Sequence, residues 1–164
     1  MISPEEKKVY EVLEKLNISY EKYEHKPVFT VDEVNELGMD IPGQHCKNLF
    51  LRNKKGDTQY LVIVDDAKKV DIKALSVQIE STKLSFASPE RLFQYLGLKP
   101  GSVSAFGLLN DIEHYVQVVL DKDMANSQQI GFHPNTNTAT VVLDYSDFEK
   151  FIKWCGNKII YIKL

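Results

Sequence analysis

The feature that most constrains the fold is a pair of apolar runs joined by a short polar turn. The runs are "NLFLRN" (48–53) and "QYLVIVDD" (59–66), and the turn between them is "NKKGD" (53–57). Runs of this length, rich in β-branched and aromatic residues and separated by a glycine-containing turn, are typical of a β-hairpin. Gly56 can supply the positive φ that such a turn needs. The sequence therefore predicts a sheet that contains at least this antiparallel pair.

The rest of the chain alternates between helical and strand patterns. Helices are predicted at 3–17, 30–38, 71–80, 88–97 and 146–156, where Ser or Thr caps, early Pro or Glu, and closing Gly or Asn recur. Further strands are predicted at 19–26, 84–87, 115–121, 138–145 and 158–164, with loops at 99–111 and 124–136. Strands often follow one another without an intervening helix. The predicted fold is therefore mixed α/β (α+β), with a largely antiparallel sheet surrounded by helices in one domain, 1–164.

Composition excludes several classes of protein. The hydrophobic fraction of 43% can supply one core, but no run of about eighteen apolar residues predicts a membrane span. The charged, helix-periodic N-terminus does not resemble a secretory leader, so cytoplasmic residence is expected. Two cysteines, Cys46 and Cys155, and four scattered histidines lack the spacing of a disulfide framework or a metal site. No metal, no cofactor and no membrane partner are predicted.

Charge is unevenly distributed along the chain. The net charge of -3 argues against a general nucleic-acid binder, and no DNA partner is expected. Residues 47–99, however, carry ten Lys or Arg against six Asp or Glu. Such an excess is found both on basic binding surfaces and on ordinary solvated faces, and charge alone favours the solvated face.

A few polar residues stand where a strand or loop could present them to a ligand. Lys47, beside Asn48, lies at the predicted mouth of a strand, where it is either an edge lysine that opposes aggregation or a cation that holds a phosphate or carbonyl. In the predicted loop 124–136, Gly131 and Pro134 lie on either side of His133, and the local pattern there favours a simple turn. Cys46 is no catalytic partner for its neighbouring histidine, because adjacent strand residues face opposite ways.

Four segments taken together resemble one known family. They are "FTVDEV", "CKNLFLRNKKGDTQYLVIVDDAKKVDIKAL", "LSFASPERLFQYLGLKPGSVSAFGLLND" and "GFHPNTNTATVVL". They resemble the YbaK/prolyl-tRNA-synthetase-associated domain family, and within it the free-standing alanyl-tRNA(Pro) deacylases, over about residues 3–160. The resemblance implies a sheet that curls toward a barrel, and an editing enzyme that hydrolyses alanine mischarged onto tRNA(Pro). Its implied partners are the acceptor end of that tRNA and, as an open question, prolyl-tRNA synthetase.

The resemblance also implies roles for individual residues. The catalytic set is Lys47, Asn48 and His133. The substrate-binding set is Phe29, Thr30 and Val34 in a helix over the pocket, Gly101, Ser102 and Ser104 in one wall, and Gly131, Phe132 and Pro134 beside the aminoacyl group. The candidate acceptor-stem contacts are Lys54, Lys55, Lys68, Lys69 and Lys73.

The implied substrate explains why no nucleophile pair or carboxylate dyad stands out. In an aminoacyl ester of the terminal ribose, the vicinal hydroxyl lies beside the scissile carbonyl and can assist hydrolysis. The protein then needs mainly to position the ester and stabilise the developing oxyanion. Three alternatives stay open at this stage: a Cys-tRNA(Pro) deacylase of the same superfamily, a non-catalytic tRNA-binding or regulatory module, and a small-molecule-binding domain without an RNA partner.

Overall fold

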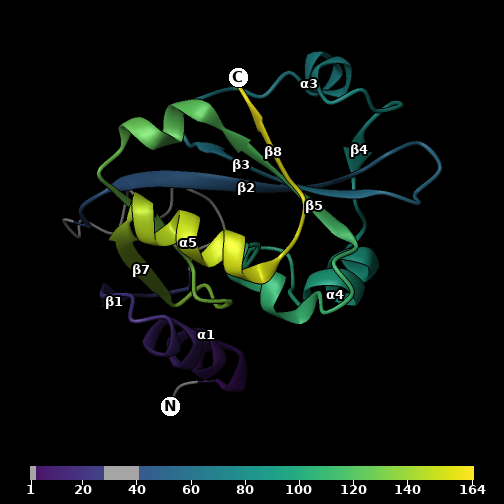
Figure 1. Cartoon of the computed structure of the whole chain (residues 1–164). Helices are drawn as coiled ribbons and strands as arrows, with labels where there is room; N and C mark the ends of the chain where they lie inside the picture. The colour runs from purple at the N-terminus through teal and green to yellow at the C-terminus, as the bar shows by residue number, and fades with distance from the viewer. Residues whose placement is uncertain (1–2, 28–40) are drawn as a thin grey trace.

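A mixed sheet organises the chain in the computed structural model, which describes residues 3–27 and 41–164 (Figure 1). The strands of the described part are β1 (Tyr20–Glu24), β2 (Gln44–Arg52), β3 (Gln59–Asp65), β4 (Ser85–Phe86), β5 (Val116–Asp121), β6 (Gln129–Phe132), β7 (Ala139–Asp144) and β8 (Ile159–Ile162). The helices are α1 (Pro4–Lys15), α3 (Ile72–Gln78), α4 (Pro89–Leu96) and α5 (Tyr145–Cys155), with 3-10 turns η1 (Ala105–Asn110) and η2 (Lys122–Asn126).

The strand order is β1-β7-β6-β2-β3-β5-β8, and β4 pairs with the far end of β2. The predicted hairpin is confirmed, with Leu49 opposite Val62 in the antiparallel β2–β3 ladder. The β2–β6, β3–β5 and β5–β8 ladders are parallel, so the sheet is more mixed than the prediction of a largely antiparallel one. The end strands β1 and β8 do not pair with each other in the described part, so the sheet stays open and is not a closed barrel.

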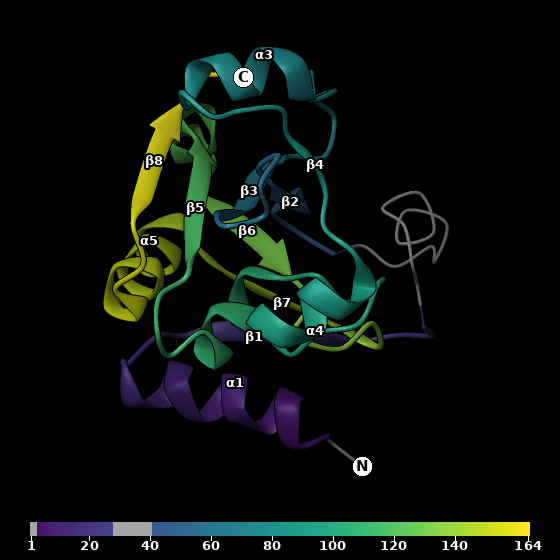
Figure 2. The ribbon, with the colours of Figure 1, turned by 90° about the vertical axis from the view of Figure 1, so that its right-hand side faces the viewer.

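Apolar clusters cover both faces of the central strands. In β3, Leu61 and Ile63 join the main cluster, while Val62 and Val64 join a second cluster that includes Leu75 of α3. A strand buried on both faces has no polar face, and this explains the unbroken apolar run that predicted it. Figure 2 shows the arrangement, with α3 above the sheet and α1, α4 and α5 around its lower half.

Helices α1 and α4 begin at the caps that the sequence predicted, whereas α5 begins at Tyr145 without a side-chain cap. Ser3 accepts a hydrogen bond from the backbone of Glu6, and Ser88 accepts one from the backbone of Arg91, each at 3.2 Å. Helix α4 ends at Gly97, whose φ of +66° is the left-handed conformation that favours glycine. Among the described residues, no helix is long and apolar enough to cross a membrane.

Two boundaries differ from the sequence predictions. Strand β2 begins at Gln44 rather than near residue 48, and the segment 124–136, predicted as a loop, contains η2 and β6. Strand β6 is only four residues long and includes a glycine, so its own sequence gives little strand signal. Its pairing with β2 on one side and β7 on the other holds it in place. The predicted helix 30–38, with Phe29, Thr30 and Val34, lies outside the described residues.

Candidate active site

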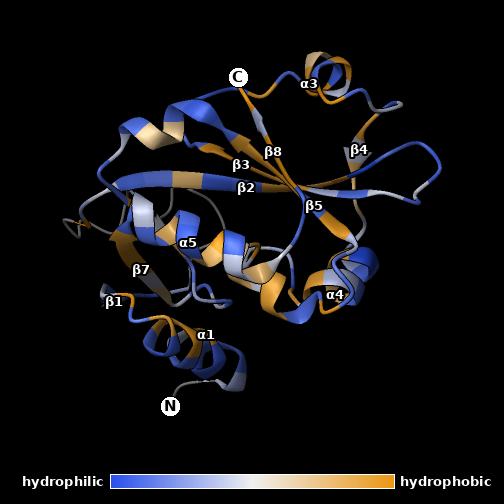
Figure 3. Cartoon of the chain, in the orientation of Figure 1, coloured by the Kyte–Doolittle hydropathy of each residue, from blue (hydrophilic) through white to orange (hydrophobic). Residues whose placement is uncertain are grey.

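The N-terminal half of β2 is polar although the strand lies in the middle of the sheet. Figure 3 shows this half mainly in hydrophilic colours, while the C-terminal half of β2 and most of β3 are hydrophobic. The polar stretch runs from Gln44 to Asn48, and each of its residues is half-buried. Burying polar side chains is unfavourable unless they find partners. A polar segment inside a central strand is therefore the first structural sign of a functional site.

Lys47 and Asn48 lie inside β2 and not at its mouth, which corrects the sequence prediction. Lys47 is opposite Val64, and Asn48 is opposite Ile63. Because successive strand residues point to opposite faces, these two side chains leave the sheet on different sides. Ile63 belongs to the main core cluster and Val64 to the second. Asn48 therefore points toward the main core, and Lys47 points to the opposite face.

Lys47 is a half-buried cation without a protein partner. Its ammonium makes no hydrogen bond and no ion pair with the described part of the chain. Its charge nevertheless affects the pKa of Asp66. Burial raises the pKa of the Asp66 carboxyl, a hydrogen bond with Asp65 raises it further, and the nearby His45 and Lys47 lower it. Lys47 is thus held in the sheet with its hydrogen-bond donors available to a ligand anion or carbonyl.

Asn48 contributes an unpaired acceptor on the other face. Its side-chain oxygen Oδ1 is buried and has no hydrogen-bond partner among the described residues. A buried polar atom left unpaired costs about 1–3 kcal/mol, so such atoms are uncommon unless a ligand or water satisfies them. Asn48 is therefore a second unsatisfied polar group in the same short stretch of β2.

His133 lies directly after β6, on the face of the sheet that Lys47 occupies. In the parallel β2–β6 ladder His45 is opposite Gly131. Lys47 is two residues beyond His45, and His133 is two residues beyond Gly131, so alternation directs both side chains to the same side. The proximity of His45 also lowers the pKa of His133, which places these two rings near each other.

The His133 ring is neutral and has one free nitrogen. Nδ1 lies 2.9 Å from the carbonyl oxygen of Ala139, and because a carbonyl only accepts, Nδ1 carries the proton and donates. Burial lowers the pKa of His133, and the neighbouring His25 and His45 lower it further, while the hydrogen bond that His133 donates to Ala139 acts in the opposite direction. Nε2 is then an unprotonated acceptor with no hydrogen-bond partner among the described residues. It can accept a proton or a hydrogen bond from substrate.

The residues around His133 have different roles from those the sequence suggested. Gly131 and Phe132 belong to strand β6 rather than to a loop. A Cβ at Gly131 would meet Thr140 at 3.4 Å, an ordinary contact, so the glycine is not required by backbone strain. It leaves the face beside His45 without a side chain. Phe132 is core, stacked on Phe148 with ring centroids 4.6 Å apart.

The loop before η1 forms a separate cavity. Gly101 has φ +89°, and the backbone of Ser102 donates to Lys99, which closes a turn. Ser104 is fully buried and caps η1 by accepting from the backbone of Phe106 at 3.2 Å. Ser102 opens onto a cavity of about 260 Å³. Its lining residues are Glu5, Phe93, Gly97, Leu98, Lys99, Ser102, Asn135 and Thr136. Lys47, Asn48 and His133 do not line it.

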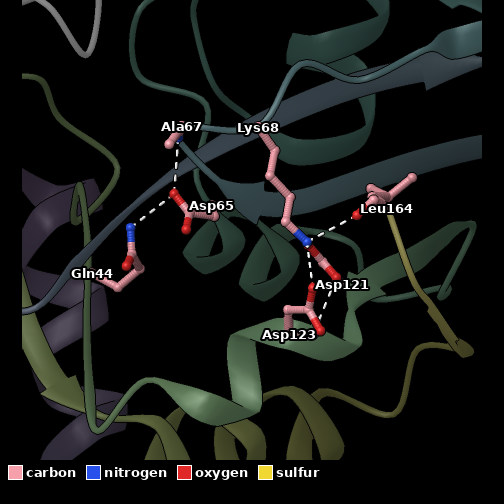
Figure 4. A network of polar contacts seen from close by, with 7 residues as sticks. All are labelled: Gln44, Asp65, Ala67, Lys68, Asp121, Asp123 and Leu164. Carbon is pink, nitrogen blue, oxygen red and sulfur yellow. Dashed lines mark hydrogen bonds and ion pairs between the residues drawn. The ribbon is translucent and has the colours of Figure 1, made fainter.

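The five lysines assigned to the acceptor stem do not form one surface. Lys54 and Lys55 are exposed in the β2–β3 turn, and Lys69 and Lys73 are exposed near the start of α3. Lys68 is used inside the fold, as Figure 4 shows. Its ammonium donates to Asp121 and Asp123 at 2.6 and 2.7 Å and to the main-chain oxygen of Leu164 at 2.9 Å.

Sequence reasoning missed two polar residues, His25 beside His133 and Asn135 in the lining of the separate cavity. His25 packs edge-on against His133 with ring centroids 6.0 Å apart, and its Nε2 pairs with the hydroxyl of Thr140 at 2.9 Å. Asn135 follows Pro134 with φ +60°, and its buried Oδ1 has no partner among the described residues. The signal for Asn135 was an asparagine after a proline in a turn-rich stretch, where asparagine tolerates left-handed backbone. His25 gave no signal, because its neighbour is far away in sequence.

Comparison with known proteins shows which family the chain matches. Residues 25–151 match the family of the aminoacyl-tRNA editing domain. The prolyl-tRNA editing protein ProX of Acetoanaerobium sticklandii is 47% identical over 152 residues, which are 93% of each chain. The prolyl-tRNA synthetase associated domain-containing protein 1 of Bos taurus is 33% identical, over 90% of this chain and 88% of that one.

Solved structures agree on the fold. A crystal structure described as a candidate trans-editing enzyme for prolyl tRNA synthetase superposes with a TM-score of 0.72, covering 100% of this chain and 99% of that one at 18% identity. The crystal structure of the hypothetical protein APE2540 gives the same TM-score at 16% identity, covering 94% and 97% of the two chains. The sequence matches extend over most of the fold described above. The chain therefore belongs to the aminoacyl-tRNA editing domain family.

Proposed function

We propose that this protein is a trans-editing hydrolase that removes alanine from mischarged tRNA(Pro). The observation that carries the proposal is that Lys47, whose ammonium has no partner among the described residues, and His133, whose Nε2 is free there, are directed to the same face of the sheet. Membership of the editing-domain family and the 47% identity to a prolyl-tRNA editing protein support the substrate class. A role in translation fidelity then assigns the protein to the cytoplasm, with prolyl-tRNA synthetase as a candidate partner.

The site residues suit ester hydrolysis without a covalent intermediate. A water molecule adds to the ester carbonyl, negative charge develops on the carbonyl oxygen, and the ribose oxygen leaves with a proton. Lys47 would hold the carbonyl or a terminal phosphate and stabilise that charge. The neutral His133 would accept a hydrogen bond from the attacking water or the vicinal ribose hydroxyl and so orient it.

Selectivity for alanine over proline would come from size. A synthetase pocket built for proline cannot strongly reject a smaller side chain, because missing methylene groups change binding by only about 1–3 kcal/mol. An editing pocket reverses the problem, since a small cavity excludes the larger pyrrolidine ring by steric clash. Cysteine is close to alanine in size and is therefore the competing substrate to measure.

The decisive experiment compares deacylation of Ala-, Cys- and Pro-tRNA(Pro) by the wild type and Lys47→Ala. We expect rapid loss of alanine, retention of proline, and a fall of roughly a hundredfold or more in the Lys47→Ala rate, as for loss of one transition-state donor. Lys122→Ala, which removes an exposed lysine of η2, is the matched control and should match the wild type. An active Lys47→Ala enzyme would remove Lys47 from the mechanism. No hydrolysis by the wild type would leave an RNA-binding module.

A further inference from the structure

The chain contains only two arginines, and the fold brings them together at the β2–β3 turn. Arg52 ends β2, and its guanidinium donates to the carbonyl oxygens of Asn53 and Lys54 at 3.2 and 3.0 Å. Arg91 lies in the first turn of α4 and donates to the carbonyl oxygen of Gly56 at 2.9 Å. Residues far apart in sequence thus converge on one short turn, whose location beyond the sheet is visible in Figure 1.

The two guanidinium groups are close neighbours. A Cβ placed on Gly56 would lie 2.6 Å from Nη2 of Arg91 and 3.0 Å from Nη2 of Arg52. Both terminal nitrogens therefore lie close to Gly56, and this close approach is possible because residue 56 has no side chain. Two like charges at this separation repel each other, and an anion that bridges them would relieve the repulsion.

The turn does not need the arginines to close. Asn53 already organises it, since its side-chain oxygen accepts from the backbone of Gly56 at 2.8 Å and of Thr58 at 3.2 Å. The Asn53 backbone adds hydrogen bonds with the same two residues, each at 3.1 Å. The arginines instead use the turn carbonyls as anchors. A guanidinium has five N–H donors, and these contacts occupy two of Arg52 and one of Arg91.

No carboxylate neutralises the pair within the part of the chain that the structure describes. Neither arginine takes part in an ion pair there. Asp57 is the acid in the turn, but its carboxylate accepts from the side chain of Asn53 at 2.6 Å. That hydrogen bond is the main cause of the lowered pKa of Asp57, and neither arginine contributes to it. The exposed Lys54 and Lys55 add further positive charge beside the pair.

We propose that Arg52 and Arg91 form a phosphate clamp for the RNA backbone of the tRNA acceptor stem, with Lys54 and Lys55 extending the surface. Planar guanidiniums with free donors match phosphate oxygens better than flexible ammonium groups do. Arg52 lies five residue steps along β2 from Lys47, a distance of about 17 Å. This is the span of a few nucleotides. Alternation directs Arg52 to the face opposite Lys47, so RNA held at Lys47 would reach the clamp by passing around the end of the hairpin. The clamp rests on the proposed tRNA substrate.

The test measures binding and turnover separately. Arg52→Gln/Arg91→Gln removes both charges while keeping an amide donor for the turn carbonyls. We expect its Kd for an uncharged RNA hairpin that reproduces the acceptor stem and 3′ end to rise roughly fivefold or more at low salt. The slope of log association constant against log salt concentration should become shallower by about two. In deacylation of Ala-tRNA(Pro), KM should rise and kcat should stay at the wild-type value.

Controls separate the clamp from general charge effects and from misfolding. Lys122→Gln/Lys158→Gln removes two exposed charges elsewhere and should leave the Kd and the salt slope unchanged. Arg91→Gln alone, which removes one of the two charges, should give about half of the slope change. Wild-type binding and salt slope in the double Arg variant would overturn the clamp even if deacylation is confirmed. If the wild type hydrolyses no ester but the RNA binding depends on both arginines, the clamp stands and the proposed function fails.

Discussion

At the scale of single residues, the site is defined by polar groups that the fold leaves without partners. Lys47, Asn48 and His133 each present a donor or acceptor that the described chain does not satisfy. Of the three, the Asn48 oxygen is the one that is buried without a partner, and a buried unpaired group lowers stability and is therefore expected where a ligand completes it. The sequence could identify Lys47 as ambiguous, but it could not show that the lysine lies in a central strand, facing away from its neighbour Asn48.

The protonation state of His133 predicts how the reaction depends on pH. Because burial lowers its pKa below the ordinary value of about 6.5, the ring stays neutral into mildly acidic solution. If Nε2 must accept, kcat should fall only when the pH drops below that lowered pKa, giving an acid limb with a midpoint under about 6.5. A pH–rate profile of Ala-tRNA(Pro) deacylation measures this.

His133→Gln should lower kcat and remove that acid limb, since glutamine does not titrate. His114→Asn, at an exposed histidine with φ +58°, is the control and should keep the wild-type profile. A wild-type acid limb in His133→Gln would mean that a different group titrates.

At the scale of elements, helix ends and the hairpin could be read from sequence, while short or pair-dependent strands could not. Ser88 and Gly97 mark the ends of α4 through local chemistry, because a cap and a left-handed residue act within one turn. The turn at Gly56 is equally local. Strand β6 depends on β2 and β7, and the cavity beside Ser102 depends on Asn135 from a distant segment. Contacts of that kind leave no periodic trace in the chain.

The α4 end can be tested by a pair of glycine substitutions. Gly97→Ala should destabilise the protein by about 1–2 kcal/mol, because alanine is strained at φ +66°. The new Cβ would also come within 2.8 Å of the Asn110 side chain. Gly131→Ala has neither problem, and its stability should stay within about 1 kcal/mol of the wild type. Urea unfolding of both variants measures the difference, and equal losses would contradict the role of the left-handed cap.

At the scale of the whole molecule, Lys68 joins three parts of the chain. It follows β3 and binds Asp121 at the end of β5, Asp123 in η2, and Leu164 beyond β8 (Figure 4). The Asp121 side chain is fully buried. Breaking this network should therefore loosen the edge of the sheet formed by β5 and β8.

Lys68→Met should lower the free energy of unfolding by about 2–3 kcal/mol, because Asp121 would keep a buried charge without its counterion. Restoring neutrality with Asp121→Asn in the same chain should recover part of the loss. Chemical denaturation at neutral pH measures both variants. If Lys68→Met alone is as stable as the wild type, the network contributes no net stability.

The same network predicts a pH window for stability. Burial tends to lower the pKa of Lys68, but its hydrogen bonds to Asp121 and Asp123 raise it overall, and the hydrogen bond from Lys68 lowers the pKa of Asp123. The Lys68 contribution is complete below its unfolded pKa and is lost as pH rises through the raised value. The Asp123 contribution is complete above its unfolded pKa and is lost as pH falls. The difference in free energy of unfolding between the wild type and Lys68→Met should thus be largest between about pH 5 and 10.

The pairing of β1 with β7 sets the order in which the protein can be completed. Tyr20 is opposite Leu143, so the N-terminal helix and strand have no sheet to join until nearly the whole polypeptide has left the ribosome. Contacts between such distant segments form late and slow the search for the native state. During synthesis, the apolar face of α1 therefore stays exposed to solvent while the β2–β3 hairpin can already form.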